Sequence, residues 1–355
     1  MDFSNVQFRH FDPSGNRQLF SFRDGNRNIL SMLPRVIFPV SLALFTLTYP
    51  YLTTMLQILL DPLQYDFMQR SLLVAVLVGI LCAVVGSYLM VQRLALLGDA
   101  ISHSVMPGLA IAFALEANIF LGAFLAGVLS TLLIALIHTR SPIKEDTAMG
   151  IVFSAFFALG ITLITVIQKD NKVDLNHFLF GNILGVGWDD VTTTVMIAAI
   201  VVGLIILLFK ELQFYTFDPV GAQAAGLPVN LLNFGLMILI ALTIVASLKV
   251  VGVILVLALL VTPGATAYLL VTRLHQMMLV GAVLSVIASI SGMYLSYYFN
   301  LPSGPAVVLV AASFFVLAFL FSPRHGLLTH PQTGNPVSPL WREVQGLIRG
   351  LRSPR

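Results

Sequence analysis

The chain is organised around the stretch Leu96-Leu97-Gly98-Asp99-Ala100-Ile101-Ser102-His103-Ser104-Val105-Met106-Pro107-Gly108. With its apolar flanks it makes a run of roughly 20 residues, which is long enough to span a bilayer as a helix. Asp99 and His103 are four residues apart and therefore share one face of that helix, one turn apart. Ionisable side chains are costly against lipid, so the pair should face a bundle interior or a wet cavity.

Pro107 and Gly108 follow this pair and should loosen the helix, which is tolerated where neighbouring helices or water satisfy the backbone. A membrane helix with an Asp-x-x-x-His pair and a break is a candidate ion pathway. Carboxylate oxygens and neutral imidazole nitrogens suit divalent first-row metals. The alternative is a hydrogen-bonded pair that only joins two helices, and the spacing alone leaves both interpretations open.

The composition indicates a polytopic membrane protein. Of the 355 residues, 58% are hydrophobic and 10% are charged, whereas soluble domains carry about 25% charged residues. The mean hydropathy is +0.94. Lys and Arg gather at segment ends and in the two tails, which fits membrane orientation and not nucleic-acid binding. The single cysteine, Cys82, excludes an intrachain disulfide, and the first 34 residues lack the apolar core of a signal peptide.

Ten apolar segments predict an all-α membrane bundle of about ten transmembrane helices. The expected spans are 36–60, 70–91, 95–115, 118–138, 147–167, 191–209, 229–248, 250–272, 276–298 and 303–322. With a cytoplasmic N-terminus, the inside loops contain Arg93, Arg140, Lys144, Lys210 and Arg273. The positive-inside rule therefore places both termini in the cytoplasm.

A polar interruption at residues 210–228 is the second notable feature. Asp218 as N-cap, Pro219 as the first helical residue and Gly226 as the end predict a short helix. A short helix on the cytoplasmic face can seat a soluble partner. An ordinary loop with one helical turn is the alternative.

The span at 250–272 contains the third feature, a Pro263-Gly264 pair inside the helix. The small residues around it allow close helix approach. Thr262 and Pro263, like Pro107, are therefore candidates for a gating or packing role, and plain packing is favoured. The chain has no Gly-x-x-x-x-Gly-Lys-[Ser/Thr] loop and cannot itself be a Walker-type ATPase. It also has no His-Glu-x-x-His or Gly-x-Ser-x-Gly motif, which weakens the case for an intramembrane hydrolase.

Residues 93–113 closely resemble the signature of the permease subunits of ABC importers for manganese, zinc and ferrous iron. Residues 144–154, the segment from Phe217-Asp218-Pro219 to Gly226, and residues 249–267 are similar to the same family in the same order. The similarity covers roughly residues 63–325, which leaves 1–35 as a cytoplasmic extension, 36–60 as an extra helix, 61–323 as the permease domain and 324–355 as a basic cytoplasmic tail.

The resemblance implies a fold similar to the vitamin B12 importer permease and a homodimer with the metal path at its two-fold interface. It also implies two ATP-binding subunits that dock on the coupling segment 210–228, through Phe217, Asp218, Pro219 and Gly226. An extracytoplasmic metal-binding protein would deliver the cargo. Asp99 and His103 match the family's pathway residues and would bind the metal.

The sequence thus predicts a non-enzymatic permease subunit in a bacterial-type plasma membrane. This subunit is expected to work by alternating access and to transport manganese, with zinc and ferrous iron ranked after it. It has no permanently bound cofactor, and its ATP is bound by a partner subunit. Two ligands on one helix do not choose among the three metals. The main alternative is a secondary transporter or channel driven by an ion gradient. An intramembrane enzyme that uses the pair as acid and base is a further one.

Overall fold

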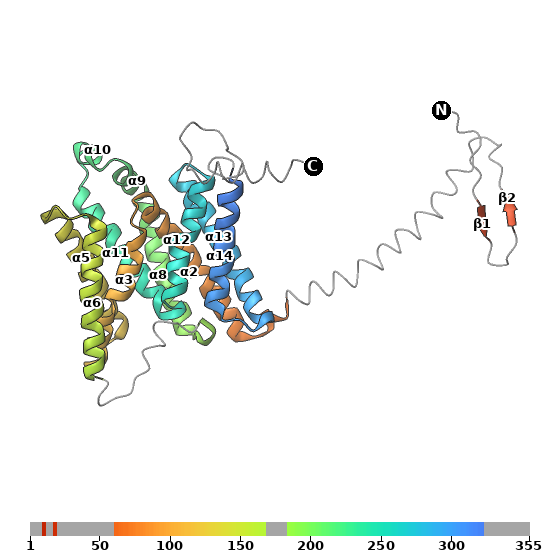
Figure 1. Cartoon of the computed structure of the whole chain (residues 1–355), viewed down its shortest axis with the longest axis horizontal. Coiled ribbons are helices and arrows are strands. Elements are labelled where there is room, and N and C mark those ends of the chain that lie inside the picture. Colours follow the sequence, from red (N-terminus) through yellow and green to blue (C-terminus); the bar gives the residue numbers. More distant parts are fainter. Residues whose placement is uncertain (1–8, 12–16, 20–59, 168–182, 323–355) are drawn as a thin grey trace, which may run out of the picture. The chain divides into compact units, whose positions relative to one another are not determined.

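The computed structural model describes residues 9–11, 17–19, 60–167 and 183–322 (Figure 1). The chain divides into two units, Met1–Asp61 and Pro62–Arg355. In the first unit, β1 (Arg9–Phe11) pairs with β2 (Arg17–Leu19) as an antiparallel hairpin that the sequence did not predict. Residues 36–59 of the first expected span, and the tail 324–355, lie outside the described residues.

The second unit is a bundle of helices (Figure 1). Its elements are η1 (Pro62–Gln64), α2 (Asp66–Val91), α3 (Ala95–Ser104), α4 (Met106–Ala114), α5 (Ile119–Arg140), α6 (Glu145–Ile167), η2 (Ile183–Gly185), α8 (Trp188–Leu207), α9 (Phe209–Phe217), α10 (Pro219–Ala224), α11 (Val229–Val251), α12 (Val253–Leu270), α13 (Leu274–Phe299) and α14 (Ser303–Phe321).

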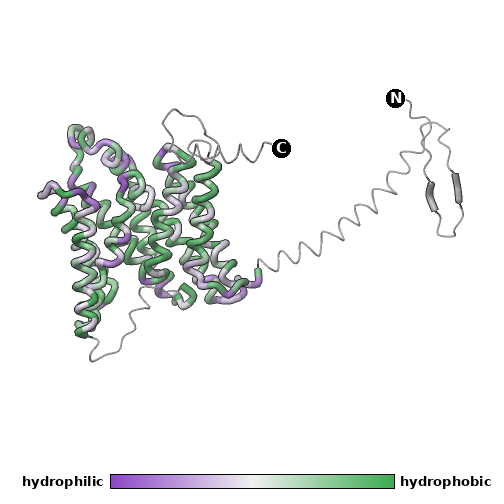
Figure 2. Tube along the Cα trace, viewed as in Figure 1, coloured by the Kyte–Doolittle hydropathy of each residue, from purple (hydrophilic) through white to green (hydrophobic). Residues whose placement is uncertain are grey.

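Nine candidate membrane spans occur among the described residues, with α3 and α4 counted together as one. Each of these nine spans coincides with one of the ten segments expected from the sequence. The remaining expected segment, 36–60, lies outside the described residues except for its last residue. The all-α, polytopic bundle is therefore confirmed for this part of the chain. Figure 2 shows why these segments could be recognised from the sequence: hydrophobic residues cover most of each helix, and hydrophilic residues gather toward the helix ends.

Helix α2 forms the centre of the packing, with α8, α11, α12 and α13 against it. Small residues bring these helices close, as expected where lipid removes the hydrophobic drive for helix association. A Cβ added to Gly86 would lie 1.8 Å from the carbonyl oxygen of Leu260 in α12. The Ser289 hydroxyl of α13 donates a hydrogen bond to the Ala75 carbonyl of α2 at 3.1 Å. The bundle is thus held by backbone approach and by hydroxyl groups.

The two ends of the bundle differ in charge. Because successive spans run in opposite directions, one end contains the basic residues Arg93, Arg140, Lys144, Lys210 and Arg273. The same end carries α9 and α10 (Figure 1). The opposite end contains the starts of α5 and α8 and the end of α11. This asymmetry is the one used above to predict the orientation.

Candidate metal site

The break expected in the span at residues 95–115 is the junction between α3 (Ala95–Ser104) and α4 (Met106–Ala114). Val105 joins them in right-handed helical geometry, with φ −74° and ψ −16°, and Pro107 is among the first residues of α4. Pro107 has no N–H to donate to the His103 carbonyl four residues earlier. The span therefore keeps its course and loses one helical hydrogen bond directly after the ionisable pair.

Asp99 and His103 lie on one face of α3, as their spacing predicts. Asp99 Oδ1 is 3.5 Å from His103 Nε2, and the side chains are 49% and 24% exposed, respectively. With metal–donor distances of about 2.1 Å, two donor atoms at this separation subtend about 113° at a shared ion. The two side chains can therefore bind one cation from their present positions.

Two neighbouring helices fix the position of this pair. Behind it, a Cβ added to Gly98 would lie 2.7 Å from Leu260 Cδ2, so α3 rests directly on α12. On the other side, Phe153 and Phe157 of α6 contact the His103 ring edge-on, with ring centroids 5.4 and 5.3 Å away. His103 Nδ1 is buried and has no hydrogen-bond partner. Sequence reasoning missed both phenylalanines, and their four-residue spacing in α6 was the available signal.

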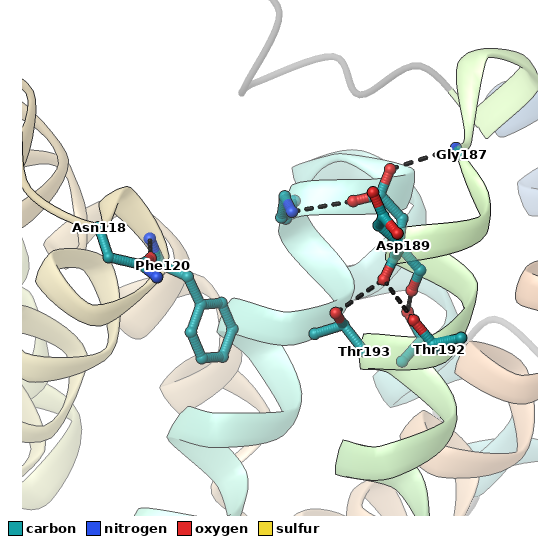
Figure 3. A network of polar contacts seen from close by, with 9 residues as sticks. Asn118, Phe120, Gly187, Asp189, Thr192 and Thr193 are labelled. Carbon is teal, nitrogen blue, oxygen red and sulfur yellow. Dashed lines mark hydrogen bonds and ion pairs between the residues drawn. The ribbon is translucent and has the colours of Figure 1, made fainter.

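One copy of the described chain supplies two side-chain donors to this site. No group of three or more His, Cys, Asp or Glu residues within 60–167 and 183–322 could hold a metal. At the opposite end of the bundle, Asp190 pairs with the Lys249 ammonium at 2.8 Å and accepts from the Gly187 N–H at 3.2 Å. The Asp189 carbonyl next to it accepts hydroxyl hydrogen bonds from α8, as Figure 3 shows. The Asp190 carboxylate and the Asp189 backbone carbonyl are therefore engaged at the start of α8.

The Asn118 side chain caps α5 near this end of the bundle. Its carbonyl oxygen accepts from the Phe120 N–H at 2.9 Å (Figure 3). A cavity of about 350 Å³ lies beside this cap, lined mainly by apolar side chains of α4, α5 and α11, with Lys249 at one edge. It contains none of the ionisable residues of the Asp99–His103 pair, so the candidate metal site and this cavity are separate.

The short helix expected within 210–228 is present as α10. Asp218 Oδ1 accepts from the Gly221 N–H at 2.8 Å, and Pro219 begins the helix. Gly226 has φ +83°, a conformation suited to glycine, and Leu227 N–H then bonds to the Ala222 carbonyl at 3.0 Å. The Phe217 and Val220 side chains beside it are exposed. The role of this segment in coupling stays a prediction.

Helix α9, which precedes α10 in the sequence, is anchored to the bundle. Leu212 is buried, and the Gln92 amide donates to Thr216 Oγ1 at 3.4 Å. Burial raises the pKa of Tyr215, and the nearby Glu145 carboxylate raises it further. The phenol therefore stays neutral at physiological pH, which suits its position against the helix bundle.

Pro263 is buried inside α12, close to α2. The Thr266 hydroxyl donates to the Thr262 carbonyl at 2.7 Å, and a Cβ on Gly264 would lie 3.3 Å from the Gly86 carbonyl oxygen. The small residues thus serve close approach between α12 and α2. A gating role for Pro107, Thr262 and Pro263 stays a prediction.

A bundle of membrane spans with a partly exposed carboxylate–imidazole pair defines a multi-pass membrane protein with a candidate cation site. The model of the ABC 3 transport family matches residues 64–322. The chain belongs to this family, and the resemblance found in the sequence is confirmed. Residues 1–63 lie outside the match.

Similar proteins extend this comparison. The chain is 48% identical to "Manganese transport system membrane protein MntC" of Halalkalibacterium halodurans, covering 75% of this chain and 91% of that protein. It is 44% identical to "Probable iron transport system membrane protein" of Haemophilus influenzae, covering 74% and 97%. Among solved structures, "PsaBC from Streptococcus pneumoniae in complex with Fab" is 41% identical with a TM-score of 0.68, covering 75% of this chain and 96% of that one.

Proposed function

We propose that this chain is the membrane-spanning subunit of an ATP-driven importer of a divalent transition metal, with manganese favoured over iron and zinc. The carrying observation is the Asp99–His103 pair, whose donor atoms lie 3.5 Å apart inside a membrane span. Intramembrane ionisable groups mark ion pathways by default. The similarity to manganese and iron transport proteins supports the same choice of cargo.

The exposure of the pair supports a homodimer. Asp99 is 49% exposed on a helix that crosses the bilayer, and a carboxylate facing lipid is costly. A second copy that covers this side would remove the cost. Each copy would then contribute Asp99 and His103, so that two carboxylates and two imidazoles line one path on the two-fold axis.

Helix α6 offers a surface for this contact. It is the least buried of the nine candidate spans in the described chain, with 11% of its window buried. Gly150, Ser154, Ala158 and Thr162 are exposed on it at four-residue intervals. Small residues at this spacing let two membrane helices approach closely. We therefore place α6 of each copy against the other, beside His103.

The chemistry of the shared path suits a metal that must also be released. Carboxylate oxygens suit manganese and imidazole nitrogens suit iron and zinc, and the absence of thiolate keeps the site from holding zinc still more tightly. Cys82, the one cysteine of the sequence, is buried and lies 3.8 Å from the Ser247 hydroxyl, so it adds no thiolate to this site. A few ligands per copy permit both entry and exit of the ion.

The ATPase partners belong at the basic end of the bundle. The positive-inside rule makes this end cytoplasmic, with both termini on the same side. Two ATP-binding subunits would dock on α10 and its flanks, through Phe217, Asp218, Pro219 and Gly226, and drive alternating access. ATP hydrolysis then occurs on those subunits and not on this chain. A metal-binding protein would deliver the cargo to the opposite end, and no cofactor is permanently bound.

Uptake into vesicles tests this proposal. The permease is reconstituted with its co-purifying ATPase and a metal-loaded binding protein, and Mn²⁺, Zn²⁺ and Fe²⁺ uptake is measured with and without ATP. We expect ATP-dependent Mn²⁺ uptake that Asp99→Asn and His103→Gln abolish. Asp189→Asn, a carboxylate change at the other end of the bundle, is the matched control and should leave uptake intact.

The outcomes separate the alternatives. Uptake that needs no nucleotide would favour the secondary transporter. Transport that persists in both pair variants, with an assembled complex, would make the pair structural. A dimer that fails to form in the wild type would remove the two-fold path.

A further inference from the structure

We infer that Phe153 and Phe157 of α6 position the His103 imidazole so that its Nε2 atom, and not Nδ1, binds the transported metal. This inference rests on the proposed function, because it concerns the same site. The two phenylalanines would not touch the ion. They are positioning residues that act through the histidine ring.

The aromatic contacts determine the orientation of the ring. Phe153 and Phe157 meet the imidazole at interplanar angles of 64° and 79°, with centroids 5.4 and 5.3 Å away. The two phenyl rings are themselves stacked at 18°. Edge-to-face contacts of this kind are favourable beyond their buried area. Two such contacts from one helix leave the imidazole little freedom to turn.

The two imidazole nitrogens differ in access. Nδ1 is buried and has no hydrogen-bond partner. Nε2 lies 3.5 Å from Asp99 Oδ1, and 24% of the side chain is exposed. A metal ion needs a lone pair with open space in front of it. Nδ1 is enclosed and does not meet that condition, whereas Nε2 lies on the side of the ring that faces the Asp99 carboxylate and can share an ion with it.

The phenylalanines perform a task that hydrogen bonds perform in many metal sites. A metal-binding histidine usually donates its second N–H to a carboxylate, carbonyl or water, which fixes the ring. In the described residues, His103 Nδ1 has no such protein acceptor. Ring packing is then what remains to hold the orientation, and it comes from α6, whereas Asp99 and His103 both belong to α3. Affinity for the ion therefore depends on how α6 lies against α3.

Pulsed EPR of bound Mn²⁺ can identify the donor nitrogen directly. The intact complex with its ATPase subunits is prepared with histidine carrying ¹⁵N at Nε2 only, and Mn²⁺ is titrated in. We expect a ¹⁵N coupling from the directly bound nitrogen. A ¹⁴N coupling of the strength of a directly bound nitrogen, with no ¹⁵N coupling of that strength, would mean that Nδ1 is the donor and would overturn the inference.

Substitutions test the positioning role. Phe153→Leu and Phe157→Leu should weaken Mn²⁺ binding by about 10-fold or more, the usual effect of losing support for a metal-binding side chain, and should weaken or abolish the nitrogen coupling. Phe156→Leu is the matched control on the same helix, because Phe156 faces a groove with α4 and α5 and makes no ring contact with His103. It should leave both readouts unchanged.

Two further arms keep the result decisive. Phe153→Met and Phe157→Met retain more of the side-chain volume, so they report on positioning if a leucine variant does not assemble. Unchanged affinity and coupling in the assembled Phe153 and Phe157 variants would refute the inference alone. Unchanged Mn²⁺ binding in His103→Ala would refute the proposed metal site itself.

Discussion

The close approach of α2 and α12 predicts a large effect from a small substitution, Gly86→Ala. The added Cβ would lie 1.8 Å from the Leu260 carbonyl oxygen and 2.8 Å from the carbonyl carbon, whereas ordinary contact begins at 3.4 Å. The obstacle is backbone, which no rotamer change can move. Helix α12 must therefore withdraw by about 1.6 Å along this contact, a displacement worked from the same packing distances.

The energetic terms oppose each other. Overpacking costs about 1–3 kcal/mol, and the upper figure applies because two backbones collide. Alanine is a better helix former than glycine, and this difference offsets the cost by about 1 kcal/mol. The net destabilisation is about 2 kcal/mol, which lowers the melting temperature by about 4–8 °C. Leu260 also packs on Gly98, so withdrawal of α12 removes the support directly behind Asp99 and should reduce metal uptake.

The chain contains its own reporter for this measurement. Cys82 is the single cysteine and is buried, so a thiol-reactive fluorophore labels the purified permease only when heating opens the bundle. Gly203→Ala and Gly235→Ala are the controls, because a Cβ at either position meets nothing within 4 Å. They should melt at or slightly above the wild-type temperature. If Gly86→Ala does the same, the reasoning from close approach is refuted.

Three other predictions use different parts of the bundle. Gly150→Ile should leave a single copy folded, since a Cβ there meets nothing within 4 Å. It should convert the proposed dimer to monomers in mass photometry, and a persistent dimer would exclude α6 as the interface. Lys249→Met and Asp190→Asn should each lower stability by about 0.5–1 kcal/mol in the Cys82 assay. The double variant should be no less stable than either single variant, whereas additive losses would mean that the 2.8 Å ion pair contributes nothing. Asp218→Ala should destabilise α10 by about 1 kcal/mol, and Gly226→Ala by about 1–2 kcal/mol. Both variants should reduce co-purification of the ATPase subunit and leave Mn²⁺ binding unchanged. Full co-purification would argue against docking on α10.

Local sequence rules predicted the features that depend on neighbours along the chain. Four-residue spacing placed Asp99 and His103 on one face, and the structure finds them 3.5 Å apart. Asp218, Pro219 and Gly226 marked the two ends of α10 within a residue or two. Apolar length identified the nine spans of the described chain. In each case, the information lies within one or a few helical turns, where the backbone geometry is fixed.

Features that depend on contacts between distant segments could not be predicted in this way. The contact of Phe153 and Phe157 with His103 requires α6 to lie against α3, some fifty residues away in the sequence. The collision distance at Gly86 depends equally on where α12 crosses α2. Glycine and phenylalanine are common in membrane helices of every kind. Their residue type alone therefore does not show which of them form a close contact.

The exposure of Asp99 in a single copy differs from what the cost of placing a charge in lipid predicts. The cost of a carboxylate against lipid predicts an enclosed position, yet the helices of one copy leave 49% of the side chain exposed. Helix α6, which packs beside this face, is itself the least buried candidate span of the described residues, with 11% of its window buried. In the proposed homodimer, a second copy placed along α6 would enclose both copies' carboxylates at once. The free-energy cost of exposing the Asp99 carboxylate to lipid in one copy is thus the physical argument for a path shared between two copies.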